Sequence, residues 1–544
     1  MQTSAAATTS ARAAVPLVTR TPGPVVIARA PAAPATPRIT GAGSGAIVTV
    51  TNATDEVNGD TTNIAALTAA PGADGISFRE AVVAANGTAG EKSIRFAASL
   101  KGAVIRQSRP GLLPPLTGGS LSIDGDIDGD GSPDVTLDGS LGSSLGIRSS
   151  GVSIARLRLV AMGITFGCAD AACEPKTVGN IRLVGNVIEG RPIVVSPMGL
   201  IRAEQVAPLS GLVWEDIEIT GNRITVGPEV DSALVLRAGN EGSSRSRISR
   251  VTISGNRLSG GRAGINLAAS DVTSADHGGT SPIRYSDGNS VEDVTIADNV
   301  VSGASHQGIV LQTANAGNRD SRIARVLISG NRLERGPDYP IVLWAGEATE
   351  TFVGDQPRST SGNAITDVAI RSNVVEATNQ SAILVAAAGK PSSNRPPAVS
   401  DNSVERVEIR DNTVTLRETA GAGIRVHGGA VYGPEAVLRN VVSDVAIVAN
   451  RITADPDARA LGIDVTGGRI AAGDGPAQQN EVRSVVVRDN VLSGTEIAVM
   501  LAGGRGPRAT GNAVVGYAIE RNDLGGAESR IVPDADGASG NSVR

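Results

Sequence analysis

Apolar and polar residues alternate in short phrases along most of this chain, and each phrase ends in asparagine. In VTISGN, Val251 and Ile253 point to one side and Thr252 and Ser254 to the other, as in a β-strand. Similar phrases, such as IRLVGN and VEIRDN, recur at intervals of 32 to 43 residues. The asparagines that close them are Asn186, Asn222, Asn256, Asn299, Asn331, Asn373, Asn412, Asn450, Asn490 and Asn522. A repeat of this length indicates a stacked array in which each unit packs against its neighbours.

Each repeat contains two further predicted strands. A short one follows the asparagine, and a second alternating one comes next, with copies such as GINL, GIVL, PIVL, GIRV and GIDV. Three strands per repeat predict an all-β fold, a right-handed parallel β-helix with like strands stacked about 4.8 Å apart. The apolar period of two excludes a helical repeat. A propeller is disfavoured because its antiparallel blades would show hairpin turns.

The asparagines have a structural explanation in this fold. An amide side chain both donates and accepts hydrogen bonds, so asparagines at one turn of every coil predict a ladder. Asparagine also tolerates the left-handed backbone that a tight turn requires. Six more asparagines each stand 10 residues before one of the ladder, which indicates a rigid intervening segment: Asn289, Asn363, Asn402, Asn440, Asn480 and Asn512. The loop elsewhere in the repeat absorbs the variation in length.

The amino-terminal part of the chain has a different pattern. Residues 1–45 form a leader or linker rich in Ala, Pro and Thr, which the composition predicts to be disordered. In GISFREAVVAANG, Ser77 and Glu80 form a capping box, and Gly87 can end the helix. Its apolar face consists of Phe78, Ala81, Val82 and Ala85. We expect this short helix to cap the open end of the β-helix.

The stretch ISFREAVVAAN, followed by KSIRF, LLPPLTGGSLSIDG and VTLDG, resembles the module of bacterial extracellular β-helix proteins that is named for a Cys-Ser-Leu-Arg-Glu-Ala motif. Here Ile76 replaces its cysteine and Phe78 its leucine. The later repeats resemble the pectate-lyase-like superfold of right-handed β-helix repeat proteins. The resemblance covers roughly residues 46–525 and implies a secreted or cell-surface protein. It implies no single reaction, since such proteins include lyases, hydrolases and adhesins.

These patterns divide the chain into four parts. The leader is followed by a cap with the first coils at residues 46–160, β-helix repeats at 161–525 and a polar tail at 526–544.

Aromatic residues are only 2% of the chain, so the core must be aliphatic and a base-stacking platform is disfavoured. Basic residues are dispersed and the formal charge is −6, which argues against nucleic acid as a partner. No apolar run is long enough to span a membrane, and no secretory signal is recognisable. Cys168 and Cys173 lie close enough in sequence to form a loop disulfide, and the alternative is that both remain free thiols.

The acidic stretch IDGDIDGDGSPDVTLDG contains the first candidate site. Its carboxylates at Asp126, Asp128, Asp130 and Asp134 surround a glycine-rich turn and offer oxygen ligands for a structural Ca²⁺ ion. Leu137 occupies the place of the final glutamate of an EF-hand loop. A solvated acidic turn without a metal is the other interpretation.

The second candidate site follows from the resemblance, because ligands in the superfold usually bind on the outer face of the first sheet, here the Gly-Ile-x-Leu strands. The polar and aromatic residues that alternation places outward are Arg237, Asn266, Gln312, Trp344, Arg425, His427, Asp464 and Thr466. Trp344 could contact a polysaccharide or cell-surface glycan, and Arg425, His427 and Asp464 are candidate catalytic residues, with Asp464 orienting the base. The other interpretation is polar decoration of a solvent face. Outward Val310, Val342 and Leu384 indicate a loop cover or a subunit interface instead.

Two functions remain open at this point. The first is a non-enzymatic extracellular β-helix scaffold for adhesion or carbohydrate contact, and the second is a polysaccharide lyase, hydrolase or epimerase acting in the first-sheet groove. Convergence of Trp344, Arg425, His427 and Asp464 in one cleft would favour the enzyme. A phage-tailspike-like protein is a further alternative, which a trimer rather than a monomer would favour.

Overall fold

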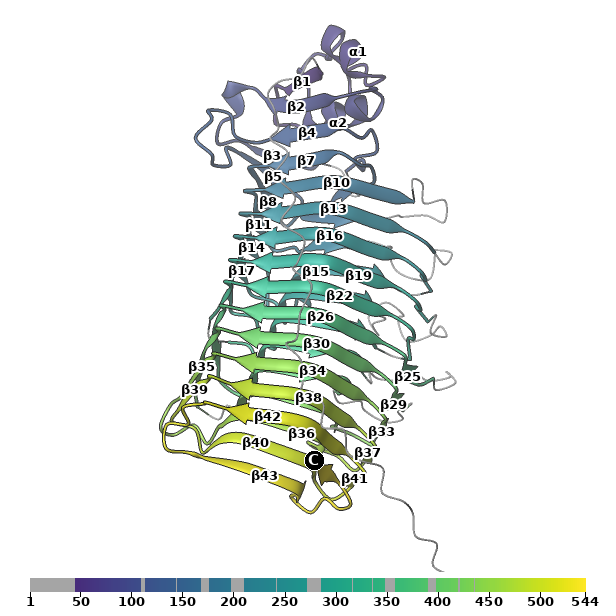
Figure 1. The fold of residues 1–544 in the computed structure, drawn as a ribbon. Coiled ribbons are helices and arrows are strands. Elements are labelled where there is room, and N and C mark those ends of the chain that lie inside the picture. The colour runs from purple at the N-terminus through teal and green to yellow at the C-terminus, as the bar shows by residue number, and fades with distance from the viewer. Residues whose placement is uncertain are drawn as a thin grey trace, which may run out of the picture.

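The computed structural model describes residues 45–108, 113–142, 144–167, 176–196, 210–240, 242–271, 285–315, 317–334, 336–347, 358–389, 398–418, 421–434 and 436–544. The chain winds as a right-handed parallel β-helix from the cap to the last coil (Figure 1). Three long parallel sheets run the length of the coil, and every strand pairs with the equivalent strand of the next turn. Among the described residues, no helix has the length and apolar character needed to cross a bilayer.

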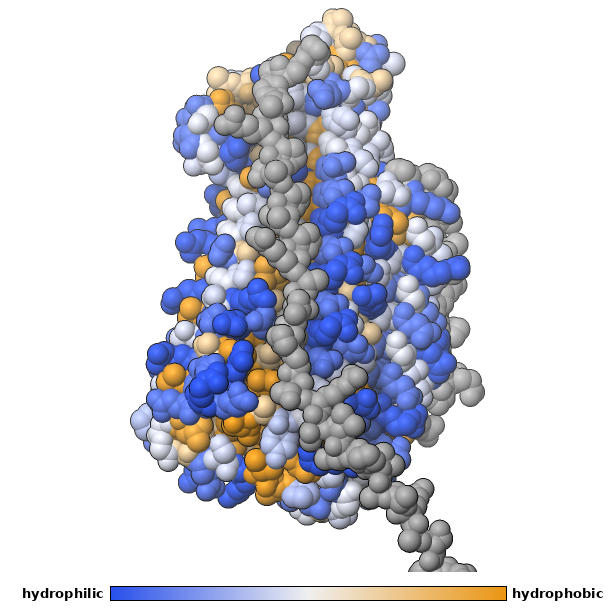
Figure 2. All heavy atoms as spheres, viewed as in Figure 1, coloured by the Kyte–Doolittle hydropathy of each residue, from blue (hydrophilic) through white to orange (hydrophobic). Residues whose placement is uncertain are grey.

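Sheet A holds the strands that precede the ladder asparagines. Its strands in spatial order are β1 (Ala46–Val50), β2 (Lys92–Phe96), β4 (Leu121–Asp124), β7 (Val152–Ala155), β10 (Thr177–Val184), β13 (Val213–Thr220), β16 (Arg247–Ser254), β19 (Ser290–Ala297), β22 (Arg322–Ser329), β26 (Ala364–Arg371), β30 (Ser403–Arg410), β34 (Val441–Val448), β38 (Glu481–Arg488), β42 (Ala513–Glu520) and β44 (Ser542–Val543). In the view of Figure 2, mostly hydrophilic side chains lie over this sheet, because alternate residues of its strands face solvent.

Sheet B holds the short strands that follow the asparagines. Its strands are β3 (Val104–Arg106), β5 (Val135–Asp138), β8 (Leu157–Val160), β11 (Val187–Glu189), β14 (Arg223–Thr225), β17 (Arg257–Ser259), β20 (Val300–Ser302), β23 (Arg332–Leu333), β27 (Val374–Ala377), β31 (Thr413–Leu416), β35 (Arg451–Ala454) and β39 (Val491–Ser493).

Sheet C holds the Gly-Ile-x-Leu strands. Its strands are β6 (Ser144–Ile147), β9 (Gly163–Phe166), β12 (Ile193–Val195), β15 (Ser232–Gly239), β18 (Ala263–Ser270), β21 (Gln307–Ala314), β24 (Tyr339–Trp344), β28 (Ser381–Ala386), β32 (Ala422–Val431), β36 (Leu461–Ile470), β40 (Ile497–Arg505) and β43 (Glu528–Ala535).

The later coils have a fourth short strand, which the prediction of three strands per coil did not include. These strands form a small parallel sheet of β25 (Thr360–Ser361), β29 (Val399–Ser400), β33 (Val437–Leu438), β37 (Ala477–Gln478) and β41 (Ala509–Thr510). Each ends just before one of the upstream asparagines. The corner between sheets C and A therefore becomes regular in the later half of the β-helix.

The ten ladder asparagines form one continuous hydrogen-bonded stack. In each step from Asn186 to Asn522, the Nδ2 atom donates to the Oδ1 atom of the asparagine one coil further on, at 2.9 or 3.0 Å. The left-handed residue is the one before each asparagine, such as Gly255 (φ 63°) or Asp411 (φ 56°). The expectation that the asparagines themselves take the left-handed conformation is therefore wrong. They stabilise the turn through the hydrogen bonds of their side chains, and the preceding residue takes the left-handed φ angle.

A second stack runs along the corner between sheets C and A. Asn363, Asn402, Asn440, Asn480 and Asn512 bond one to the next and then to Asn541. Ser321 stands between Asn289 and Asn363, where its backbone N–H donates to the amide of Asn363. The fixed distance of 10 residues between the two kinds of asparagine is therefore the length of sheet A between two amide-lined corners.

The helix at the N-terminal end caps the coil. Helix α2 (Phe78–Asn86) has the predicted capping box between Ser77 and Glu80, and Gly87 follows it with a right-handed φ of −81°. The ring of Phe78 stacks on Phe96 of the first coils, with 6.0 Å between centroids. A short helix, α1 (Ile64–Ala69), and a 3₁₀ turn, η1 (Ala98–Leu100), complete the cap and were not predicted.

The Ser-Arg-Glu segment of the cap has a structural role. The buried Glu80 carboxylate accepts hydrogen bonds from the backbone N–H groups of Asn58, Gly59 and Ser77. Arg79 forms a two-pronged ion pair with the buried Asp55. These contacts tie the loop after β1 to the start of α2, so the motif holds the cap together.

Residues 526–544 do not form the predicted polar tail. Strand β43 pairs with β40, and β44 pairs with β42, so this segment adds the last part of a coil. Every residue of β43 is exposed or half-buried, so neither face of this strand is buried. One large aliphatic cluster fills the coil from Val48 to Val514 and includes Trp214.

Candidate functional site

The predicted site residues do lie on the outer face of sheet C, in two columns that cross the coils. One column joins Val235, Asn266, Val310, Val342, Leu384, Arg425, Asp464 and Met500. The other joins Arg237, Ala268, Gln312, Trp344, Ala386, His427, Thr466 and Ala502. The residues between the two columns, such as Leu267 and Val426, face the main core, as do Ile265 and Ile424, which stand one residue before the first column.

The expectation of a solvent-facing row is wrong, because the columns are buried. Asp464 and His427 have no exposed surface, Trp344 is 3% exposed and Arg425 5%. Val310, Val342, Trp344 and Leu384 belong to an apolar cluster that is separate from the main core. Polar decoration of a solvent face therefore does not describe this face of the protein.

Three predicted ligand-contacting residues lie far from the catalytic candidates. Arg237 stands on β15, five strands before Arg425 on β32, and forms an ion pair with the buried Asp271. Asn266 and Gln312 lie on β18 and β21, the first two of the four strands between β15 and β32, and have apolar neighbours in their columns. The structure does not bring these residues into one site with Arg425.

The other predicted residues converge around the Asp464 carboxylate. Arg425 Nε lies 3.0 Å from Asp464 Oδ2, across adjacent strands of sheet C. Thr466 Oγ1 donates to Asp464 Oδ1 at 2.9 Å. Two arginines absent from the prediction approach Asp464 Oδ2, the oxygen that Arg425 contacts: Arg505 Nη1 at 3.5 Å and Arg469 Nη1 at 3.7 Å. One carboxylate thus faces three guanidinium groups.

Aromatic side chains form the other half of the site. The Trp344 ring meets Tyr339 edge to face, with 5.7 Å between centroids. A Cβ atom placed on Gly389 would lie 3.7 Å from His427 and from Tyr432, and 3.8 Å from Trp344 Nε1. Burial and the neighbouring Tyr432 raise the pKa of the Tyr339 hydroxyl. Trp344 therefore approaches His427 across two coils, as its column position predicts.

The charges in this site settle its protonation. Burial, together with the positive charges of Arg469 and Arg425, lowers the pKa of His427 to about 3, so its ring is neutral at pH 7. Neither ring nitrogen has a hydrogen-bond partner among the described residues. Burial alone would raise the pKa of Asp464, but the three arginines and Thr466 outweigh it and hold the pKa below 3.8. Burial and the charge of Arg425 lower the pKa of Arg469.

Four residues of this site were missed by the sequence reasoning: Tyr339, Tyr432, Arg469 and Arg505. Their side chains are partly exposed, unlike those of Asp464 and His427, and form the accessible edge of the site. A signal for the arginines was available. Arg469 and Arg505 each follow a Gly-Gly pair, and each stands five residues after an outward-facing residue of its own strand, Asp464 or Met500. The two arginines are also partners in the sheet register. No comparable pattern marks the two tyrosines.

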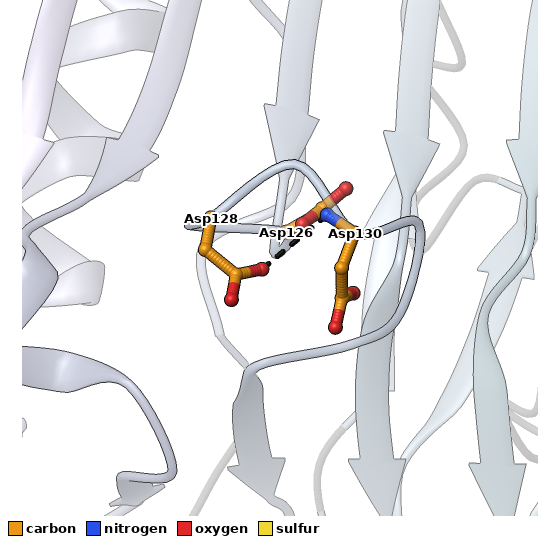
Figure 3. Close-up of side chains that lie close together, drawn as sticks. All are labelled: Asp126, Asp128 and Asp130. Atoms are coloured by element: carbon orange, nitrogen blue, oxygen red, sulfur yellow. Dashed lines mark hydrogen bonds between the residues drawn. The ribbon is translucent and has the colours of Figure 1, made fainter.

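The acidic loop between β4 and β5 brings three of its four aspartates together (Figure 3). Carboxylate oxygens of Asp126, Asp128 and Asp130 lie within 4.8 Å of one another, a separation that one hard cation can bridge. Asp134 turns away and accepts from the backbone of Ile127 at 2.8 Å. Lys101 forms an ion pair with Asp128 and competes with a cation for that carboxylate. The predicted residues therefore fit a Ca²⁺ ion in part, through three carboxylates.

Two further sequence features fall on residues outside those described. They are the predicted leader, up to residue 44, and the Cys168 and Cys173 pair.

Comparison with solved structures finds matches that cover most of this chain at low similarity. No protein-family model matches the chain, and no curated protein matches it. The A-module of the mannuronan C-5 epimerase AlgE4 of Azotobacter vinelandii is 12% identical, with coverage of 84% of this chain and 91% of that one and a TM-score of 0.30. A mutant tailspike protein of E. coli bacteriophage HK620, in complex with a pentasaccharide, is 13% identical over 82% of this chain and 72% of its own, with a TM-score of 0.33. At these TM-scores the likenesses carry no argument about fold, activity or ligand.

Proposed function

We propose that this protein is a secreted or cell-surface β-helix scaffold that binds glycans over the outer face of sheet C. The observation that carries the proposal is the convergence of four partly exposed side chains on neighbouring coils, beside the buried Trp344 and Arg425: Tyr339, Tyr432, Arg469 and Arg505. The whole chain has only two Trp and four Tyr residues, so half of them gather at this one site. Aromatic rings beside fixed hydrogen-bond donors suit the apolar faces and hydroxyl groups of sugars.

The protonation of the site supports binding rather than catalysis. A general acid or base works best when its pKa lies near the operating pH. His427 has a pKa of about 3, and Asp464 stays ionised because three arginines surround it. Both groups are also fully buried, so neither reaches a bound sugar without movement.

A second candidate, a polysaccharide lyase, hydrolase or epimerase, has one specific observation in its favour. Arg505 lies between two carboxylates, with Nη1 3.5 Å from Asp464 and Nε 2.7 Å from the exposed Asp536. Glycosidases use two carboxyl groups flanking the scissile bond. Against this role, the lowered pKa of Asp464 disfavours it as the proton donor.

A glycan array combined with product assays tests the proposal. We expect binding of polysaccharides without new reducing ends and without unsaturated products. Tyr432→Ala should weaken binding, whereas Tyr285→Ala, a half-buried tyrosine before β19, should leave it unchanged. Turnover of any bound polymer would favour the enzyme. Binding that is equally strong in both variants would place the glycan elsewhere.

The proposed location and assembly have their own measurements. Fractionation of the native producing cells should find the protein at the surface or in the medium. Light scattering gives the oligomeric state, and a stable trimer would favour the tailspike-like alternative over an independent scaffold.

A further inference from the structure

The surroundings of Asp464 carry more positive than negative charge. Arg425, Arg469 and Arg505 all lie within 4.0 Å of one Asp464 oxygen. The remaining carboxylate nearby, Asp536, contacts only Arg505 and is 62% exposed. The described part of the chain thus places three guanidinium groups around a single buried negative charge.

This excess is not neutralised from within the described protein. Arg469 Nη1 is buried without a hydrogen-bond partner, and burial together with the nearby charge of Arg425 lowers the pKa of this side chain. His427 lies in the same cluster with both ring nitrogens unpartnered and no exposed surface. Buried donors and charges normally have partners, and leaving them unpaired is costly. The cluster therefore has unused capacity for an acceptor that carries negative charge.

The accessible side of the cluster is formed by the two arginines at its edge. The side chains of Arg469 and Arg505 are 22% and 23% exposed, whereas that of Arg425 is 7% exposed. The two are register partners on β36 and β40, so their backbones lie about 4.8 Å apart. Two guanidinium groups at this separation suit one oxyanion, which each can bind through charge-assisted hydrogen bonds.

We infer that Arg469 and Arg505 bind an oxyanion carried by a glycan, a carboxylate or a sulfate group, beside the Tyr339 and Tyr432 rings. Asp464 acts as a positioning residue, because its buried carboxylate holds the two guanidinium groups without reaching solvent itself. Arg425 pairs with the same carboxylate from the adjacent strand. The inference rests on the proposed glycan binding and specifies its ligand class as acidic. It also explains why Asp464 and Asp536 do not balance the three arginines: the ligand supplies the third negative charge.

Binding of the full chain to matched polymers tests the inference. We would measure affinities by calorimetry for a polyuronate, the same polymer after carboxyl reduction, and a sulfated glycan. We expect polyuronate binding to weaken at least tenfold on carboxyl reduction and to decline as NaCl is raised. A sulfated glycan that binds with the same dependence on Arg469 would identify sulfate as an equivalent source of the oxyanion.

Three variants separate an oxyanion site from a structural cluster. Arg469→Gln and Arg505→Gln should each lower polyuronate affinity at least tenfold. Arg257 is an exposed arginine on β17 of sheet B, five coils before Arg469, so Arg257→Gln should leave the affinity unchanged. Arg469→Gln should leave the melting temperature unchanged or raise it, because it removes a repelled charge. A fall in melting temperature together with unchanged affinity would instead make Arg469 structural and overturn the inference.

The outcomes distinguish this inference from the proposed function. If neutral and acidic polymers bind equally and Tyr432→Ala weakens both, the glycan site stands and the oxyanion site is wrong. If no polymer binds, both are wrong.

Discussion

At the scale of single residues, burial changes what the polar groups on sheet C can do. Asp464 and His427 occupy positions that alternation places outside the coil, yet neither has exposed surface. In such surroundings a charge persists only beside opposite charge, and a histidine loses its proton. Asp464 is held ionised by arginines, whereas His427 is neutral. The free energy of unfolding therefore depends on the negative charge of Asp464 and on His427 staying neutral.

His427 should make the protein less stable as pH falls from neutrality. Its pKa is about 3 in the folded protein against 6.5 normally, so the unfolded chain alone binds the proton between these values. Stability is therefore complete above pH 6.5 and declines by up to about 1.4 kcal/mol per pH unit toward pH 3. Urea unfolding between pH 7 and 4.5 should show a flatter decline in His427→Gln. His306→Gln, where the ring is 45% exposed, should retain the wild-type slope.

Removing the Asp464 charge should be costly, because it leaves three guanidinium groups together without their shared partner. We expect Asp464→Asn to lower the free energy of unfolding at pH 7 by about 3–5 kcal/mol. Asp401→Asn breaks an exposed ion pair with Arg439 and should cost about 0–1 kcal/mol. Equal effects in denaturant titrations of the two variants would contradict this view of the cluster.

At the scale of elements, the asparagine stacks connect each coil to the next at two corners. A buried ladder amide bonds to both neighbouring asparagines and to a backbone carbonyl, as Asn412 does with Asn373, Asn450 and Ile370. Because the stack is continuous, each interior member satisfies groups in three coils. The last member, Asn522, is half-buried and has an asparagine neighbour on one side only.

Interior and terminal asparagines should therefore differ in their contribution. We expect Asn412→Ala to lower the free energy of unfolding by about 1–3 kcal/mol, since it leaves buried turn amides unpaired. Asn522→Ala should cost less, because water can replace its bonds. Urea denaturation of both variants measures the difference, and a larger loss in Asn522→Ala would be inconsistent with it.

The acidic loop is the second element with a testable property. We propose that Asp126, Asp128 and Asp130 bind Ca²⁺, in competition with Lys101 for Asp128. Millimolar Ca²⁺ should raise the melting temperature, and EDTA should reverse the rise. Lys101→Gln should enlarge the response because it removes the competing cation. If Ca²⁺ changes the melting temperature of neither the wild type nor Lys101→Gln, the loop is a solvated acidic turn without a metal.

At the scale of the whole molecule, stability depends on covering the two ends of the coil. The cap closes the N-terminal end through α2 and its buried Phe78. At the other end, β43 and β44 cover the edges of β40 and β42, and Asn541 completes the second asparagine stack. Open edges of parallel sheets invite further pairing.

Deletion of residues 526–544 should therefore lower the melting temperature and promote association. It removes two strand pairings and exposes the edges of sheets A and C at once. Circular dichroism and light scattering measure the two effects. Asn541→Ala, which loses only the end of the stack, should melt close to the wild type and remain dispersed. If the deletion leaves the melting temperature unchanged, the coil before residue 526 is stable without these two strands covering it.

The sequence alone determined the architecture, because a β-helix repeats one local pattern. The alternation around Ile265 and Ile424, the asparagine spacing and the capping box at Ser77 and Glu80 are local properties, and each predicted an element correctly. Register then follows, since equivalent residues of successive coils must stack. The repeat pattern alone places Arg425 beside Asp464 and Trp344 two coils from His427, as the register of sheet C confirms.

Only the tertiary structure decided what those positions do. Burial of the outer columns depends on what surrounds them in space, which alternation along a strand does not encode. Arg469, Arg505, Tyr339 and Tyr432 lie beyond the repeated core of their strands or after corners, where the coils differ in length and bend. Their meeting at Asp464 depends on how those corners fold. The repeat therefore locates the columns, and the three-dimensional surroundings of Asp464 determine the charge and accessibility of the site.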